Sequence, residues 1–262
     1  EGTLVAHNAG FDVGFIEQNC RVLGLEQEFT AVDTVALARV LLPTLSKYKL
    51  NLVAKALGIS LENHHRAVDD AGATAEIFVK FVEMLKDQHI MNLKEMNKFG
   101  DRNVNAIRKM PTHHIILIAQ NDIGRYNLYQ LITASHMTYY ARRPRIPKSL
   151  INEHREGIII GSACEAGELY RAVLEKQSSQ QIARLADFYD YYEIQPIGND
   201  MFMLEDEKTP NINTEEDLRN VNREIVELGE KFGKPVVATC DVHFLDPEDE
   251  IYRRIIQCGN GF

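Results

Sequence analysis

The chain has 262 residues, 45% of them hydrophobic and 26% charged, which suffices for one large domain or two small ones. A formal net charge of −9 argues against a surface that coats nucleic acid along its length. No apolar run reaches the ~18 residues of a membrane span, so we expect no membrane partner.

The cysteines and the chain ends bear on location and completeness. The four cysteines are scattered and form no CxxC pair, which favours a reducing, cytoplasmic location. The chain has no initiator Met and no basic leader, and it ends at Gly259-Asn260-Gly261-Phe262 without a closing element. We therefore expect both ends to be cuts through a longer protein.

Residues 1–86 carry short strands and amphipathic helices. Apolar periodicity and helix stops predict strands at 3–6 and 31–33, and helices at 13–23, 34–42, 50–57 and 69–86. The last of these helices has apolar residues at three- and four-residue steps throughout, so it should be long and amphipathic.

Residues 87–110 are polar and mixed, and we expect them to be a connector. Beyond it, strands alternate with helices: strands are predicted at 115–119, 157–161, 189–195 and 235–239, and helices at 126–135, 165–175 and 214–232. The last helix should be capped by Thr214. This alternation predicts an α/β fold with a mostly parallel sheet or a barrel.

Polar residues near two helix starts suggest a metal-dependent site in the first 86 residues. His7-Asn8-Ala9-Gly10-Phe11-Asp12 leads into the first helix, and His64-His65-Arg66-Ala67-Val68-Asp69-Asp70 leads into the long one. Carboxylates suit hard ions such as Mg²⁺, and two ions roughly 4 Å apart can activate water and stabilise a leaving oxygen. An imidazole of pKa about 6.5 can take the proton from that water. The two segments therefore hold a partial set for phosphodiester cleavage.

Each of these residues also has a simpler interpretation. Asp12 alone is typical of a helix cap, and Asp69-Asp70 is ordinary charge in a first helical turn. The pair His64-His65 could lie on the surface. The combination, with Asn8 and Phe11 at matching offsets, favours a functional site.

The HNAGFD segment resembles the second motif of the DEDD-type proofreading exonucleases, and His65-x₄-Asp70 resembles their third motif in its histidine-containing variant. The resemblance implies a ribonuclease-H-like fold that removes mononucleotides from DNA 3′ ends with two Mg²⁺ or Mn²⁺ ions. It assigns Asp12 and Asp70 as metal ligands and His65 as the general base. It also implies that Asn8 and Phe11 line the site near the terminal nucleotide.

Two further observations qualify this resemblance. Asp33-Thr34 matches a recurrent family position for which we assign no ligand role. The family's first motif, an Asp-x-Glu on the first strand, has no counterpart before Asp12. We therefore expect the polypeptide as given to bind metals poorly and to cut DNA slowly.

Metal-binding residue types recur at predicted strand ends in residues 111–262. His113-His114 precedes a strand, Cys164-Glu165 follows one, and Asp241-Val242-His243 follows another. In an extended Asp-x-His both side chains share a face. A carboxylate, imidazoles and a thiolate suit Zn²⁺, Mn²⁺ or Fe²⁺ better than Mg²⁺. The alternative to a metal site is a pair of histidines at a strand edge with all hydrogen bonds made, together with a small buried cysteine.

The segment ATCDVHFLDPED resembles the final Asp-x-His motif of the polymerase and histidinol phosphatase (PHP) domain, and residues 112–136 resemble its middle part. The resemblance implies a distorted (β/α) barrel with a metal cluster. By this match the ligands are His114, Cys164, Asp241 and His243, with Glu165 as a further candidate. The family's opening His-x-His is absent, so we expect an incomplete cluster.

The order of the two partial domains resembles the PolC-type DNA polymerase III alpha subunits of low-GC Gram-positive bacteria, in which the exonuclease is inserted within the PHP domain. It divides the chain into part of an exonuclease (1–86), a connector (87–110) and part of a PHP domain (111–262). The implied partners are a DNA primer 3′ end, the remaining polymerase domains, the sliding clamp and replisome proteins.

Other interpretations stay open. The chain could be a non-catalytic scaffold of a polymerase, or a free-standing phosphoesterase with a PHP site. Arg142, Arg143 and Arg145 could contact DNA phosphates, since arginine binds phosphate bidentately. They could equally lie in a solvated loop or pair within the molecule.

Overall fold

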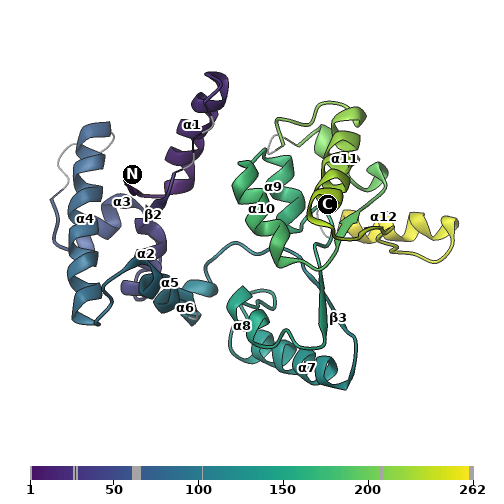
Figure 1. Cartoon of the computed structure of the whole chain (residues 1–262), viewed down its shortest axis with the longest axis horizontal. Coiled ribbons are helices and arrows are strands. Elements are labelled where there is room, and N and C mark those ends of the chain that lie inside the picture. Colours follow the sequence, from purple (N-terminus) through teal and green to yellow (C-terminus); the bar gives the residue numbers. More distant parts are fainter. Residues whose placement is uncertain are drawn as a thin grey trace. The chain divides into compact units, whose positions relative to one another are not determined.

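The computed structural model describes residues 2–25, 27, 29–60, 66–101, 103–206 and 209–259. The chain folds as two compact units. Figure 1 labels their helices and strands. The first contains the residues up to Thr112 together with Asn121–Gly157, and the second contains His113–Gln120 and the residues from Ile158 onward. The first unit is therefore discontinuous in sequence.

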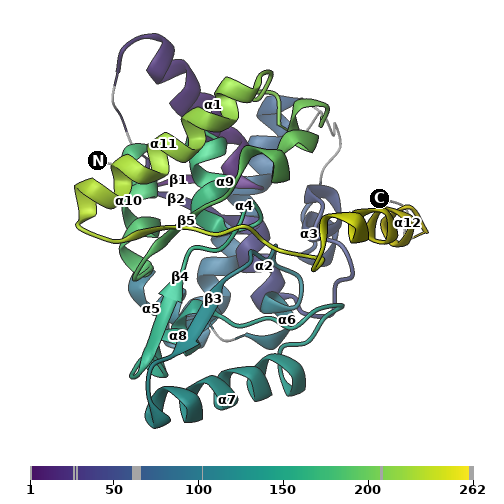
Figure 2. The ribbon, with the colours of Figure 1, turned by 90° about the vertical axis from the view of Figure 1, so that its right-hand side faces the viewer.

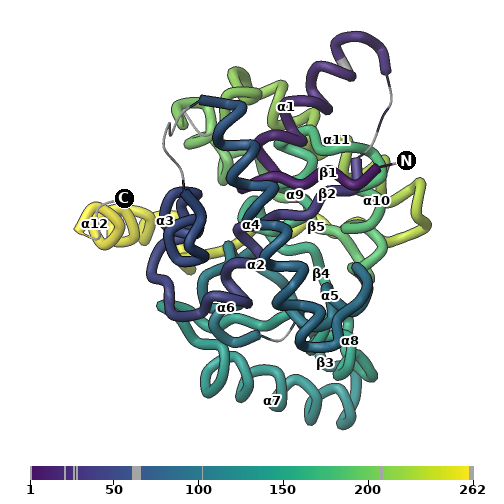
Figure 3. Tube along the Cα trace, turned by 90° about the vertical axis from the view of Figure 1, so that its left-hand side faces the viewer, coloured from purple at the N-terminus to yellow at the C-terminus, as the bar shows by residue number. Residues whose placement is uncertain are grey.

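The first unit pairs two short strands and surrounds them with helices. Its elements are β1 (Leu4–Ala6), α1 (Ala9–Val22), β2 (Ala31–Asp33), α2 (Thr34–Leu41), α3 (Leu50–Ala56), α4 (Ala67–Asp87), α5 (Leu93–Asp101), α6 (Val104–Ile107), α7 (Asp122–Met137) and α8 (Lys148–Glu153). Strands β1 and β2 lie side by side (Figure 3). They are parallel, with Leu4 opposite Ala31 and Ala6 opposite Asp33.

A hydrophobic core joins α2, α3 and α4 to this strand pair. Its buried members are Val32, Leu37, Ala38, Leu41, Val53, Ala54, Ile77, Phe81 and Leu85. The three- and four-residue spacing of Ile77, Phe81 and Leu85 puts them on one face of α4, as the sequence predicts. Phe81 and Ile77 are fully buried, and α4 contacts β1, so this face of α4 packs against the strand pair.

The second unit contains two separate strand pairs. Its elements are β3 (Ile116–Ala119), β4 (Ile158–Gly161), α9 (Glu168–Leu174), α10 (Ser179–Phe188), β5 (Tyr192–Ile194), α11 (Glu215–Phe232), β6 (Val236–Ala238) and α12 (Glu250–Gly259), with short 3₁₀ helices at Ile197–Asn199, Met201–Leu204 and Pro247–Asp249. Strands β3 and β4 are antiparallel (Figure 2), and β5 and β6 are parallel.

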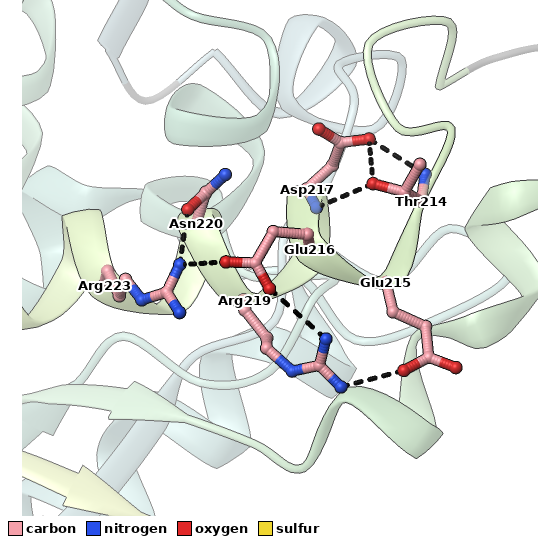
Figure 4. A network of polar contacts seen from close by, with 7 residues as sticks. All are labelled: Thr214, Glu215, Glu216, Asp217, Arg219, Asn220 and Arg223. Carbon is pink, nitrogen blue, oxygen red and sulfur yellow. Dashed lines mark hydrogen bonds and ion pairs between the residues drawn. The ribbon is translucent and has the colours of Figure 1, made fainter.

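Helix α11 begins where its sequence predicts. The Thr214 hydroxyl accepts from the Asp217 N–H, and the Asp217 carboxylate accepts from the Thr214 N–H at 2.8 Å, which forms a capping box. Arg219 pairs with Glu215 at 2.8 Å and Glu216 at 3.3 Å on the solvent side (Figure 4). Gly233 ends the helix in a left-handed conformation, φ +63°.

The predicted α/β class is confirmed, but no closed barrel forms among the described residues. Each described sheet has two strands, and the pairing of β3 with β4 is antiparallel, not parallel as expected. A parallel pair needs the intervening segment to pack back as a crossover. Residues 121–157, which connect β3 to β4, belong to the first unit instead.

The polar stretch expected to be a connector contains helices. Helices α5 and α6 lie within residues 87–110, and Asn103 caps α6 by accepting from the Ala106 N–H at 3.0 Å. Ala106 and Ile107 are buried. Arg145 donates to the carbonyls of Ile107, at 3.1 Å, and Met110. Its guanidinium therefore serves the fold of the first unit, as in the intramolecular interpretation.

Candidate functional site

The HNAGFD segment forms the turn from β1 into α1. Asn8 adopts a left-handed conformation, φ +73°, which asparagine tolerates better than most residues. Its backbone N–H donates to Asp33 Oδ1 at 3.0 Å. The same oxygen accepts from the Val35 N–H at 2.8 Å and caps α2. Asp33 thus ties together the carboxyl ends of β1 and β2, a role that its family position alone did not reveal.

Asp12 and Phe11 lie in the first turn of α1 and face solvent. Asp12 is exposed, and Phe11 is 70% exposed. An exposed carboxylate in a first helical turn can bind a cation, and an exposed aromatic ring can stack on a base. These are the chemical properties that the exonuclease resemblance requires of the two residues.

Asp70 lies in the first turn of α4 and is half-buried. Its N–H donates to the Arg66 carbonyl at 2.9 Å, and its carbonyl accepts from the Thr74 hydroxyl at 2.8 Å. Asp69 lies 3.8 Å from Arg66 in an ion pair. The predicted general base His65, with His64, lies outside the described residues.

His7 is held between two elements of the first unit. Its Nε2 lies 2.8 Å from the Tyr48 carbonyl and its Nδ1 2.8 Å from the Thr34 hydroxyl. A carbonyl only accepts, so Nε2 carries a hydrogen, and in neutral His7 Nδ1 accepts from Thr34. Burial lowers the pKa of His7 below its ordinary value of 6.5. The ring is therefore neutral at neutral pH, and it joins the HNAGFD turn to the segment before α3.

In the second unit the structure brings His114 and Cys164 together, 50 positions apart in the sequence. His114 Nδ1 lies 3.3 Å from Cys164 Sγ, and the His114 N–H donates to the Ala166 carbonyl at 3.0 Å. Burial is the main cause that raises the pKa of Cys164 to about 11; the hydrogen bond with Glu165 and the charges of Glu165 and Asp241 add to it, against a smaller lowering by the Ala166 backbone. The side chain is a thiol at neutral pH, and a metal would have to displace its proton.

Asp241 and His243 follow β6, as the sequence predicts, but the backbone at Asp241 is not extended as the shared-face argument assumed. Asp241 has a left-handed conformation, φ +48°. His243 Nδ1 lies 2.5 Å from the Asp241 carbonyl oxygen and 3.8 Å from its carboxylate. The four residues assigned by the PHP resemblance therefore occur as two contacting pairs, His114 with Cys164 and Asp241 with His243.

The sequence did not single out Asp200, a buried acid in the second unit. It is 1% exposed and accepts from the Tyr170 hydroxyl at 2.9 Å. Burial, together with the charge of Glu165, raises its pKa to about 6. Asp200 lies in a Gly-Asn-Asp stretch typical of a turn, so no sequence signal pointed to its burial.

Neither a metal cluster nor a membrane span occurs within the described ranges. No three His, Cys, Asp or Glu residues of the described part of the chain are arranged to hold a metal ion. No helix in that part is both long and apolar enough to cross a membrane.

Comparison with known proteins first defines the class. Residues 1–78 match the RNase_T family model, whose description is exonuclease. These residues contain the strand pair, the HNAGFD turn and the first turns of α4. Within the first unit, residues 1–78 are thus similar to exonucleases.

Individual curated relatives indicate a more specific similarity than the family model does. The chain is 55% identical over 260 residues to DNA polymerase III PolC-type of Clostridium perfringens, covering 99% of this chain and 18% of that protein. It is 45% identical to DNA polymerase III PolC-type of Caldanaerobacter subterraneus, covering 90% of this chain and 17% of that protein. It is 40% identical to DNA polymerase III PolC-type of Halalkalibacterium halodurans, covering 100% of this chain and 18% of that protein. The predicted resemblance to PolC-type DNA polymerase III is confirmed along almost the whole chain, which spans under a fifth of these relatives.

Proposed function

We propose that the chain is a segment of a replicative DNA polymerase that removes mononucleotides from DNA 3′ ends during proofreading. The observation that carries this proposal is the joint match of residues 1–78 to an exonuclease family and of the chain to PolC-type polymerases. DNA with a primer 3′ end is its substrate, and the rest of the polymerase, the sliding clamp and replisome proteins are its partners. It would act in the cytoplasm.

In this proposal Asp12 and Asp70 hold Mg²⁺ or Mn²⁺. Both are carboxylates, the donor type that hard cations take, and both lie in first helical turns around the β1–β2 pair. Bound divalent ions supply Lewis-acid stabilisation of the reacting phosphate. His65 accepts the proton of the attacking water, while Asn8 and Phe11 hold the terminal nucleotide.

The test uses the full-length protein that contains this segment. Asp12→Asn and Asp70→Asn should each lower mononucleotide release from a 5′-labelled single strand on the order of a hundredfold or more. Asp69→Asn is the matched control, because it makes the same change one residue earlier in α4 and should retain activity. Primer extension by the same variants is the control for folding, because a variant that extends primers normally is folded. Unchanged degradation by both variants would instead favour the scaffold interpretation.

A second site is proposed in the second unit, where His114, Cys164, Asp241 and His243 bind Zn²⁺, Mn²⁺ or Fe²⁺. The contact between His114 and Cys164 favours it, since imidazole and sulfur donors suit these ions. Metal content measured by mass spectrometry should fall in His114→Ala and Cys164→Ser. Mn²⁺-dependent phosphomonoester hydrolysis that disappears in His243→Ala would assign this unit a phosphoesterase activity.

A further inference from the structure

A basic pocket adjoins the HNAGFD turn in the first unit. It has a volume of about 510 Å³ and is lined by His7, Asn8, Val35, Arg39, Ser46, Lys47, Tyr48, Lys49 and Lys109. Four of these side chains are cationic and none is a carboxylate, although the whole chain has a net charge of −9. Positive charge is thus concentrated at one place in an acidic protein.

The segment that carries Lys47 and Lys49 is anchored at Tyr48, between them. The Tyr48 carbonyl contacts His7 Nε2 at 2.8 Å, and its hydroxyl accepts from Lys109 Nζ at 2.7 Å. Lys109 also donates to the Leu45 carbonyl at 2.9 Å. Lys47 and Lys49 remain exposed. The anchoring fixes the backbone of the two lysines and leaves their ammonium groups available for an anion.

Arg39, on α2, adds a donor whose hydrogen-bonding capacity is unmet. Its Nε is buried and has no hydrogen-bond partner among the described residues. A buried unsatisfied donor costs about 1–3 kcal/mol, and a small turn of the Arg39 side chain toward an anion in the pocket would remove this cost. Guanidinium is well suited to phosphate because it presents paired N–H groups.

Two groups beside the pocket are already engaged in hydrogen bonds. Asp33, the carboxylate whose charge acts on His7, already accepts from the N–H groups of Asn8 and Val35. His7 has both ring nitrogens engaged in hydrogen bonds. The available groups of the pocket are therefore cationic, and they suit an anion that carries several oxygens.

We propose that this pocket binds a backbone phosphate of the DNA strand whose 3′ end is degraded, through Arg39, Lys47 and Lys49. Asn8 lines the pocket and lies in the turn that leads into α1, which carries Asp12, so the pocket adjoins the element where the strand terminus is proposed to bind. The inference rests on the proposed exonuclease function for the identity of the anion. The basic pocket thus holds the strand and is separate from the residues that cut it.

Lysine footprinting of the full-length protein tests this directly. In EDTA, where no cleavage occurs, a single-stranded oligonucleotide should slow acetylation of Lys47 and Lys49, read by mass spectrometry. Lys55, exposed on α3 and outside the pocket, should be modified at an unchanged rate. Equal modification of all three lysines with and without DNA would overturn the proposal. Equal protection by deoxynucleoside monophosphate or inorganic phosphate would also overturn it, in favour of a free-anion site.

Kinetics separate this proposal from the proposed function itself. The double variant Lys47→Gln/Lys49→Gln should raise KM for a short single strand and leave kcat unchanged, with Lys55→Gln as control. The slope of log KM against log salt should decrease by about 0.7 for each DNA phosphate that the variant no longer binds. A fall in kcat at constant KM would contradict a strand-holding pocket. Failure of the Asp70→Asn test would refute the exonuclease and leave the footprint as an independent result.

Discussion

Asp200→Asn should remove a specific pH dependence from the stability of the second unit. Asp200 is 1% exposed, its Oδ2 accepts from Tyr170, and its Oδ1 has no hydrogen-bond partner in the described part of the chain. Burial disfavours the carboxylate and is the main reason that the pKa rises from 3.8 to about 6. Asparagine keeps the shape and an acceptor for Tyr170 but cannot ionise.

The magnitude follows from linkage between protonation and folding. Because the pKa is raised in the folded state, the folded protein binds the proton more tightly than the unfolded chain between pH 3.8 and about 6. Stability from this group is therefore full below pH 3.8 and is lost as pH rises through about 6. A shift of about two units corresponds to roughly 3 kcal/mol.

The assay is a urea titration at pH 4 and pH 7, read by pulsed hydrogen exchange at one fixed labelling pH. Peptides covering residues 189–205 report the second unit. Between the two pH values the native protein should lose roughly 2 kcal/mol more stability than Asp200→Asn, somewhat less than the full effect because the unfolded group is already partly ionised at pH 4. Asp187→Asn, which removes an exposed carboxylate, should behave like the native protein. Identical pH dependence in the native protein and Asp200→Asn would refute the reasoning.

Three further predictions concern the first unit, each measured by the same hydrogen-exchange titration on peptides of that unit. Phe81→Ala should destabilise the unit by about 3–5 kcal/mol, because the ring is fully buried in the core. Phe81→Leu should cost much less, and equal losses would contradict the packing argument. Gly124→Ala should destabilise by about 2 kcal/mol or more, since a Cβ there would collide with the Gly157 backbone. Gly72→Ala is its control: a Cβ there meets nothing within 4 Å, so it should be neutral or slightly stabilising. Asp33→Ala should cost about 1–2 kcal/mol, because two backbone N–H groups lose their acceptor, and an unchanged midpoint would refute that role.

Local patterns predicted the long elements well. Helix α4 was expected at 69–86 and occurs at Ala67–Asp87, and α11 starts after the expected cap at Thr214. These helices have long periodic faces, so local sequence and tertiary burial agree. Helix α10 was missed, although Ser178 and Gln181 form a capping box that could have signalled its start.

The expected partial barrel is not confirmed, and the pairing of β3 with β4 depends on information that local sequence does not contain. Alternating strands and helices predict a crossover only if each helix packs on its own sheet. Helix α7 follows β3 but belongs to the first unit, so β3 and β4 pair as antiparallel neighbours. Which unit a helix joins depends on contacts that are distant in the sequence.

For the candidate sites too, local sequence predicted some features, and others depended on contacts between distant segments. The resemblance of sequence motifs to two families selected Asp12, Asp70, His114 and Cys164, and the structure brings the last two into contact. The roles of Asp33 and Lys109 were missed, because each depends on a hydrogen bond to a segment at least 25 residues away. The metal-ligand and general-base roles of Asp12, Asp70 and His65 stay predictions.

The return of residues 121–157 to the first unit has a practical consequence for dissecting the molecule. The polypeptide passes between the two units three times, at 112–113, 120–121 and 157–158. No single truncation point can liberate either half intact. A nick at 112–113 would leave two fragments that each carry segments of the first unit, so packing within that unit would hold the fragments together on a sizing column.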